Sequence, residues 1–380
     1  MTYGGIFSLT ASLKNVLAAQ GVSFSEALLL GVSGGLGAGY ILWEFKSHEF
    51  ANIVMGFNNR WNYAAERLQT LCERLAIPST QQETAGVKAA AANLQAALDT
   101  GIPFIAWTDK AHLPYQNLPE SLKGYIPNIV GVHGLKEGCI LLDDLADNLY
   151  SISPDDFAAA RGRIVSDKNR LQIIGKPLIT DLSTAVLTGI NDHIAHLSRD
   201  SESFSLPAYK KWAKMLTDTR NKKGWPVVFA QRKGLYPTLR SIYEGILLDG
   251  SDGAALRLLY ADFLDEAASI IARPALSEAA AHYRQIADQW RAFATAALPD
   301  TPFQSTRQLL HKRYDSFKHN QPEAARAAID QIYRLEADYK NAFPMSDSEV
   351  SDLFTSLQTN LNTLYEAESA ALATLIRVMQ

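Results

Sequence analysis

The 380-residue sequence is poor in cysteine and has no excess of basic side chains. Its two cysteines, Cys72 and Cys139, are too few for the disulfide framework of a small secreted protein, so we expect a reducing, cytoplasmic location. Its 36 Lys and Arg residues are outnumbered by 40 Asp and Glu residues, which gives a net charge of -4. This balance argues against nucleic acid as a partner, because nucleic-acid binding requires a basic surface.

Long uninterrupted hydrophobic runs are also absent. The most apolar segment, FSEALLLGVSGGLGAGYILWEF (24–45), contains Glu26, five glycines and Glu44. A transmembrane helix needs about 20 predominantly apolar residues, so we interpret this segment as buried core and expect no membrane span. The opening MTYGGIFS lacks a basic region of the kind that begins a signal peptide, so we expect none.

The first part of the chain shows both helical and strand-like patterns. Segments 12–21, 25–32, 64–78 and 87–101 have apolar residues at helical spacing. They are followed by the strand-like runs PFIAWTD (103–109), NIVGVHGL (128–135) and CILLDD (139–144). Helices followed by antiparallel strands predict an α+β domain over residues 1–165.

From about residue 165 we expect no further strands, and a second, all-α domain over residues 166–380. Its last segment places Val350, Leu353 and Leu357 at spacings of three and four, after a capping box formed by Ser346 and Glu349. Such an amphipathic helix could pair with a second copy in a homodimer; the alternative is packing within its own bundle.

Ser8 begins a predicted helix in the stretch GGIFSLTASLKNVLAAQG (4–21). A nucleophile there gains from the helix dipole and from free backbone N–H groups, which can form an oxyanion hole. The simpler interpretation, which local sequence favours, is that Ser8 or Thr10 is the N-cap of this helix.

Other motifs indicate no cofactor. The segment GVSGGLGAGY (31–40) lacks the Lys-Ser/Thr of a phosphate loop and the glycine order of a dinucleotide site, so we interpret it as close packing against an apolar helix. His193 and His196 lie three residues apart without further metal ligands nearby, and we expect them at the surface or in the bundle. We therefore expect no metal, nucleotide or flavin.

A charged segment, LRLLYADFLDEAA (256–268), carries Arg257 and Tyr260. We expect a solvated helix face here. Arg257 and Tyr260 are candidate substrate-binding residues only if this face docks against the other domain.

The stretches 8–46, 103–116 (PFIAWTDKAHLPYQ), 128–145 (NIVGVHGLKEGCILLDDL) and 222–229 (KKGWPVVF) occur in the order of a known family. The chain resembles proteins with a butirosin biosynthesis protein H N-terminal domain followed by a helical domain. The resemblance implies a papain-like fold and thioester chemistry. The family's namesake moves an acyl group from an acyl carrier protein to an aminoglycoside amine, with Cys, His and Asp as nucleophile, base and orienting residue.

Carried over to this sequence, the nucleophile position falls on Ser8 and the histidine position on Asn128, six residues before Gly134. The acidic position falls on Asp143 or Asp144. His133 is a candidate substitute for Asn128, but an odd separation puts the two on opposite faces of a regular strand, so His133 would need a bulge or turn. Glu26 and Tyr115 are further candidates in the matching stretches.

A serine without a base is a poor nucleophile. We therefore expect a natural-product biosynthesis enzyme with a non-standard site, acting on a carrier-bound acyl or peptidyl thioester by acyl transfer, cyclisation or release. Its partners would be an acyl carrier protein and a small-molecule acceptor. The alternatives are a non-catalytic carrier-binding protein, or a papain-like amide hydrolase that uses Ser8.

Overall fold

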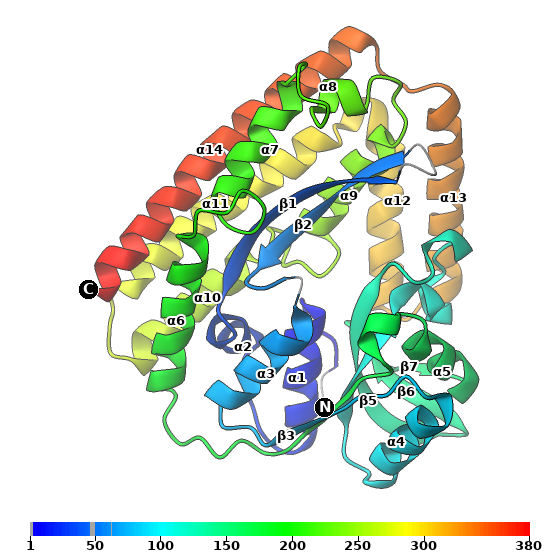
Figure 1. Cartoon of the computed structure of the whole chain (residues 1–380), viewed down its shortest axis with the longest axis vertical. Helices are drawn as coiled ribbons and strands as arrows, with labels where there is room; N and C mark the ends of the chain where they lie inside the picture. The colour runs from blue at the N-terminus through cyan, green and yellow to red at the C-terminus, as the bar shows by residue number, and fades with distance from the viewer. Residues whose placement is uncertain (1–2, 46–49, 62) are drawn as a thin grey trace. The chain divides into compact units, whose positions relative to one another are not determined.

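A computed structural model describes residues 3–45, 50–61 and 63–380 (Figure 1). The chain divides into two compact units, and the segments of the two units alternate along the sequence. Unit 1 comprises Met1–Leu29, Leu68–Asp181 and Leu309–Asp330. Unit 2 comprises Leu30–Arg67, Leu182–Gln308 and Gln331–Gln380.

Unit 1 is built on an antiparallel sheet, which has six strands within the described residues, in the order β3-β8-β4-β5-β6-β7. The strands are β3 (Ser79–Gln82), β4 (Phe104–Asp109), β5 (Pro127–Lys136), β6 (Cys139–Asp143), β7 (Tyr150–Ile152) and β8 (Leu171–Ile174). The three predicted strands correspond to β4, β5 and β6. β8 is an exception to the expectation that no strand follows residue 165: it has only four residues, and its pairing with β3 and β4 is a long-range contact with no local signal.

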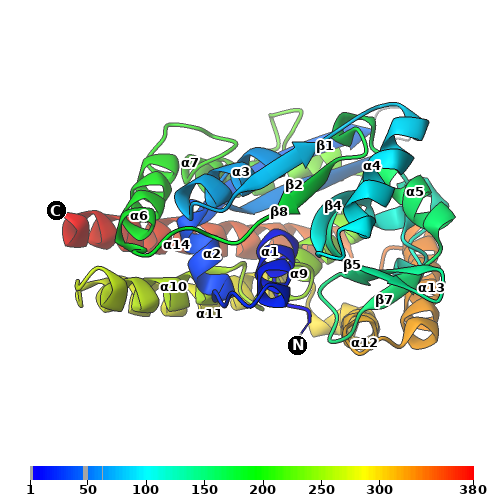
Figure 2. The same ribbon diagram turned by 90° about the horizontal axis from the view of Figure 1, so that it is seen from below.

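The helices of the first part are α1 (Ser8–Ala19), α2 (Glu26–Val32), α3 (Ala64–Arg74), α4 (Val87–Asp99) and α5 (Pro154–Gly162). Four of these, all but α5, were predicted. α1 packs on β5 and β4, as Figure 2 shows, and α5 packs on β4. One face of the sheet forms a core from alternate residues such as Phe104, Ala106, Val130 and Val132. The end of α12 (Asp300–Lys318) and the start of α13 (Pro322–Asn341) also belong to unit 1.

Unit 2 combines helices with a hairpin of β1 (Leu36–Phe45) and β2 (Phe50–Asn58). Its other helices are α6 (Ser183–Leu197), α7 (Pro207–Thr217), α8 (Trp225–Val228), α9 (Leu235–Leu247), α10 (Arg257–Ile270), α11 (Leu276–Ala297) and α14 (Asp347–Met379). α14 packs along α11 and α7 (Figure 1). The α+β class is confirmed, with the sheet in the first part of the chain and helices over most of the rest.

The glycine-rich segment 31–40 does pack closely against an apolar helix. A Cβ atom on Gly31 would meet the Phe263 ring of α10 at 2.2 Å, and one on Gly35 would meet the Tyr260 ring at 2.6 Å. The sequence did not indicate that this segment continues as strand β1. Glycine is uncommon in strands, so the glycines of this segment gave no strand signal. They are required because they leave room for a neighbouring ring: a Cβ on Gly39 would lie 2.5 Å from the Trp61 indole.

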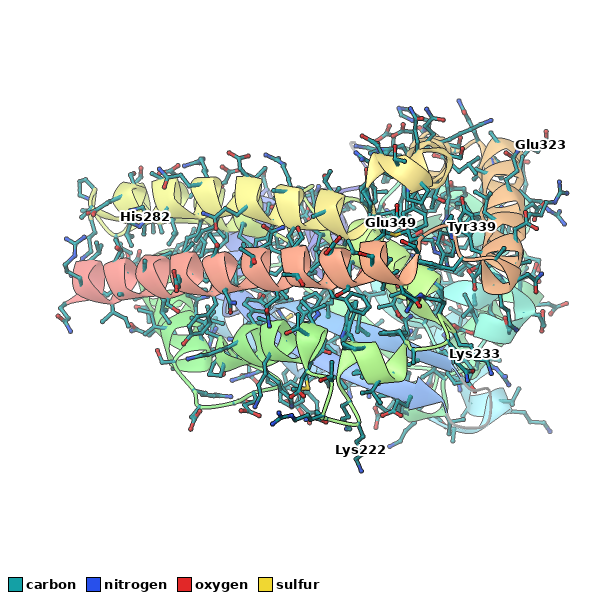
Figure 3. All side chains as sticks on the ribbon, turned by 90° about the horizontal axis from the view of Figure 1, so that it is seen from above. Lys222, Lys233, His282, Glu323, Tyr339 and Glu349 are labelled. Carbon is teal, nitrogen blue, oxygen red and sulfur yellow. The ribbon has the colours of Figure 1, made fainter. Side chains whose placement is uncertain are left out.

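The start of α14 is as predicted. Ser346 Oγ accepts from the Glu349 N–H at 3.3 Å, and Glu349 Oε2 accepts from the Ser346 N–H at 2.7 Å, which completes the capping box. Glu349 lies at the start of α14 (Figure 3). Within the described part of the chain, no helix is both long enough and apolar enough to cross a membrane.

The expectation of a solvated face at the start of α10 is wrong for Arg257 and Tyr260, which are both fully buried. The Arg257 guanidinium lies 2.7 Å from Glu368 of α14, which also accepts from Trp290 Nε1 at 2.9 Å. The cation also lies 5.1 Å from the Trp290 ring. A partner 111 positions away in sequence compensates the buried charge, and this pairing is invisible in the local pattern. His193 and His196 are likewise buried in this unit.

We predict that Arg257→Met lowers the free energy of unfolding by about 3–5 kcal/mol, because it leaves the Glu368 carboxylate buried without its cation. Arg377→Met is the matched control, since Arg377 pairs with Glu278 at 2.7 Å on the surface, and it should cost less than about 1 kcal/mol. Urea unfolding followed by tryptophan fluorescence measures both. Equal losses in the two variants would contradict this account of unit 2.

Candidate active site

Ser8 is the first residue of α1 and is half-buried. Phe7 occupies the N-cap position in an extended conformation and provides no side-chain cap. The prediction that Ser8 or Thr10 is the N-cap is therefore wrong. The first intrahelical bond runs from Ala11 N to Phe7 O, so within the described chain the N–H groups of residues 8–10 have no acceptor. The free N–H groups of this first turn place partial positive charge beside the Ser8 hydroxyl, which the Glu26 carboxylate at the same turn partly offsets.

Glu26 holds the turn that leads into α1. Its buried carboxylate accepts from Phe7 N at 2.7 Å, from Ile6 N at 3.0 Å and from Thr10 Oγ1 at 2.9 Å. Lys14 Nζ lies 3.9 Å away. Because both oxygens are engaged by the turn, this geometry suits a residue that positions Ser8. The predicted contact between Glu26 and substrate stays a prediction.

Asp144 is the carboxylate that meets Asn128. Its Oδ1 accepts from Asn128 Nδ2 at 3.0 Å, and its Oδ2 accepts from Tyr115 OH at 3.0 Å and from Gln116 Nε2 at 2.8 Å. Burial and the neighbouring Asp144 charge raise the pKa of Tyr115 well above its usual value, so the phenol stays a donor. The Asn128 amide cannot accept a proton at this site. Asp144 is thus fully hydrogen-bonded to neutral groups.

Asp143 makes a separate cluster. It accepts from Gly4 N at 3.0 Å and from Asn15 Nδ2 at 2.5 Å, and His133 Nε2 lies 3.9 Å from its Oδ2. The Tyr3 ring meets the His133 ring edge-on at 5.2 Å between centroids. Sequence reasoning missed Asn15, although a polar residue on the apolar face of a helix was an available signal.

Strand alternation separates the two clusters. Asn128 is an even number of residues from Val130 and Val132, so it lies on the same face of β5, toward the unit 1 core. Asp143 instead contacts α1. The pairing of β5 with β6 is irregular between Val132 and Leu135, as a bulge at His133 would require. Even so, His133 lies beside Asp143, so it does not take the place of Asn128 next to Asp144.

Neither cluster is bonded to the nucleophile position. No hydrogen bond joins the Ser8 side chain to another described residue. Asn15, which ties Asp143 to α1, comes seven residues after Ser8, which is about 10 Å along the helix axis. In this structure an assembled Ser-His-Asp triad is therefore not present among the described residues.

Burial sets the charge of the second cluster. It raises the pKa of Asp143 to about 6 and lowers the pKa of His133 to about 4. At neutral pH the imidazole is neutral and the carboxylate is ionised. Between these two values both groups are neutral.

Arg257 and Tyr260 lie in the interior of unit 2, where neither exposes surface to a ligand. Their predicted contact with substrate stays a prediction. Over the described residues, no group of three or more His, Cys, Asp or Glu side chains is arranged to hold a metal ion.

The two shifted pKa values have opposite effects on stability. The folded-state pKa of Asp143 is raised from 3.8, so its contribution to stability is lost as pH rises through about 6. The folded-state pKa of His133 is lowered from 6.5, so its contribution is lost as pH falls toward about 4. We predict that Asp143→Asn gains about 2 kcal/mol in unfolding free energy relative to wild type between pH 4 and pH 6.

Urea unfolding at pH 4, 5 and 6 measures this difference, with Asp99→Asn at an exposed position as the control. A pH-independent difference between Asp143→Asn and wild type would show that Asp143 has an ordinary pKa.

Two family models match the chain, one after the other along the sequence. Residues 8–143 match the family model described as butirosin biosynthesis protein H, N-terminal. Residues 157–343 match a domain of unknown function, DUF4872. No curated protein matches the chain. The first match begins at Ser8 and ends at Asp143, so it covers the start of α1, Asn128 and Asp143, and Asp144 lies one residue beyond it. The chain therefore has the two-domain architecture of the butirosin biosynthesis protein H-like family, with that N-terminal domain followed by DUF4872.

Proposed function

We propose that this protein is a cytoplasmic enzyme of natural-product biosynthesis that acts on an acyl or peptidyl group carried as a thioester by a carrier protein. The family match and the name of that family support the biosynthetic role. The observation that carries the proposal is the uncapped first turn of α1, with Ser8 at its head and no base bonded to it. We also propose that α1 packed on an antiparallel sheet corresponds to a papain-like core.

The first turn of α1 suits an oxyanion better than it suits a serine nucleophile. When an acceptor amine attacks the thioester carbonyl carbon, a C–N bond forms and negative charge moves to the carbonyl oxygen. The N–H groups of residues 8–10 and the Ser8 hydroxyl would stabilise that charge. Collapse then breaks the C–S bond, the carrier thiolate leaves, and the ammonium proton passes to the thiolate or to solvent.

This route needs no protein base on Ser8. An alkyl hydroxyl has to lose its proton before or during attack, and a base normally takes it. Asn128 cannot accept that proton, and His133 lies beside Asp143 with no hydrogen bond to Ser8. Attack by a separate amine gives acyl transfer. Attack by an amine within the bound acyl or peptidyl group gives cyclisation, and attack by water gives release.

A non-catalytic carrier-binding protein is the second candidate, favoured by the same lack of a base at Ser8. The two candidates differ in turnover. A carrier-binding protein would hold the thioester intact, whereas the proposed enzyme would consume it when an amine is present.

The proposed chemistry is tested by intact-protein mass spectrometry with acyl N-acetylcysteamine thioesters, combined with thiol release in the presence of an amine. All variants carry Cys139→Ser, because Cys139 is a partly exposed free thiol. Burial raises the pKa of Cys72 to about 11, which keeps it unreactive. We expect no adduct on the Ser8 protein, amine-dependent thiol release, and an adduct on Ser8→Cys.

Two further variants sharpen this test. Ser8→Cys/Asn128→His should acylate at the Ser8→Cys rate, because residue 128 faces Asp144 on the side of the sheet opposite α1, where a histidine could not take the proton of the thiol at position 8. Ser8→Cys/His133→Gln should acylate at the Ser8→Cys rate. A covalent adduct on the Ser8 protein that Ser8→Ala abolishes would contradict direct attack. Thiol release that no amine accelerates would favour the carrier-binding candidate.

A further inference from the structure

Unit 2 contains a cavity of about 330 Å³ beside strand β1 and helix α7. Three lysines line it: Lys211 and Lys214 on α7, and Lys223 on the loop that follows. The apolar part of its lining comes from β1 and α7, in the side chains of Ile41, Leu42 and Met215. The lining thus combines three lysines and one glutamate, Glu202, with an apolar wall, which suits an anion carried on an organic chain.

The positive charge is concentrated in one short segment. Residues 210–223 hold five Lys and one Arg against the single acid Asp218, a net charge of +5, whereas the whole chain has a net charge of -4. This segment builds one wall of the cavity and its rim. A local field of this sign attracts anions and raises their rate of association.

The protein supplies little negative charge to these lysines. Lys214 and Lys223 form no ion pair with any described residue. Lys211 lies 3.9 Å from Glu202, which also lines the cavity and whose side chain is 72% exposed. Asp218 accepts from Arg220 N at 2.9 Å and from Asn221 N at 3.0 Å, and these bonds, with smaller effects of the Lys214 and Arg220 charges, lower its pKa. A bound anion would therefore find the ammonium groups of the cavity available.

The walls of the cavity are held in place by hydrogen bonds. Tyr40 N donates to Ser203 O at 3.3 Å, which ties β1 to the loop before α7. Lys223 N donates to Asn221 Oδ1 at 2.9 Å, which fixes the lysine-bearing loop. Gln358 of α14 donates to Ala213 O at 3.0 Å and so anchors α7. The site is thus largely formed before any ligand arrives, which lowers the entropic cost of binding.

We propose that this cavity binds the phosphate group of a phosphate ester, with the three lysines on the phosphate and the apolar wall along its organic arm. Three ammonium groups around one cavity suit a dianionic phosphate, which accepts several charge-assisted hydrogen bonds at once. The inference does not depend on the chemistry proposed at Ser8, because the cavity lies wholly within unit 2.

Lys222 and Lys223 provide a matched pair for the test. The two are adjacent on the same loop and both are exposed, but Lys223 lines the cavity, whereas Lys222 does not and projects away from the helices (Figure 3). Lys222→Gln and Lys223→Gln remove the same charge from the same loop. A diffuse electrostatic effect would weaken anion binding equally in both variants. A specific site would weaken it only in Lys223→Gln.

The experiment is isothermal titration calorimetry of the full chain with 4′-phosphopantetheine, glucose 6-phosphate, inorganic phosphate and pantetheine. We expect phosphopantetheine to bind and pantetheine, which lacks the phosphate, not to bind. Lys214→Gln and Lys223→Gln should each weaken binding about tenfold, and Lys222→Gln less than twofold, since a charge-assisted hydrogen bond is worth about 1.5 kcal/mol or more.

Each outcome bears on the proposal. Tighter binding of phosphopantetheine than of glucose 6-phosphate would assign the arm to a pantetheinyl group, and equal binding would assign the site to phosphate esters in general. Equal weakening in all three variants, or binding of pantetheine as tight as that of phosphopantetheine, would overturn it. N-acetylcysteamine thioesters carry no phosphate, so Lys223→Gln should not change the rate at which they acylate Ser8→Cys. A failure of the proposed phosphate site can therefore be distinguished from a failure of the chemistry proposed at Ser8.

Discussion

Two consecutive buried carboxylates at the end of β6 organise unit 1. Strand alternation sends Asp143 toward α1 and Asp144 toward the core face, and each must find donors on its own side. Asp143 recruits the N-terminal segment and α1 through Gly4 and Asn15. Asp144 accepts hydrogen bonds from Tyr115, Gln116 and Asn128 on the core side of the sheet, opposite α1. The path of residues 3–8, and with it the position of Ser8, follows from these bonds.

The same arrangement decides what chemistry unit 1 can support. Asn128 occupies the position that resembles the family's histidine, and its amide donates a hydrogen bond to Asp144. His133 is neutral at neutral pH, and its Nε2 lies 3.9 Å from Asp143 Oδ2. What remains at Ser8 is a helix start without a side-chain cap, fixed by Glu26. Such a site can stabilise developing negative charge without taking a proton, which is why thioester transfer to an amine fits it better than a serine acyl-enzyme.

Local patterns predicted the elements that local chemistry determines. The helix at Ser8, the strands that became β4–β6 and the capping box at Ser346 all carry their signals within a few residues. Long-range pairings carried no such signal, so β8 was missed and the charge of Arg257 was expected at the surface. The choice between Asp143 and Asp144 needed the register of β5 against β6. Glycines that make room for Trp61 concealed β1.

The most direct test of the central claim is the pKa of a thiol placed at the head of α1. In a Cys139→Ser background, the rate of alkylation of Ser8→Cys by iodoacetamide, measured against pH, reports the thiolate fraction. The uncapped N–H groups of the first turn should lower this pKa well below the usual value of about 8.5. A pKa at or above that value would show that the start of α1 does not stabilise an anion, and it would contradict the proposed oxyanion site.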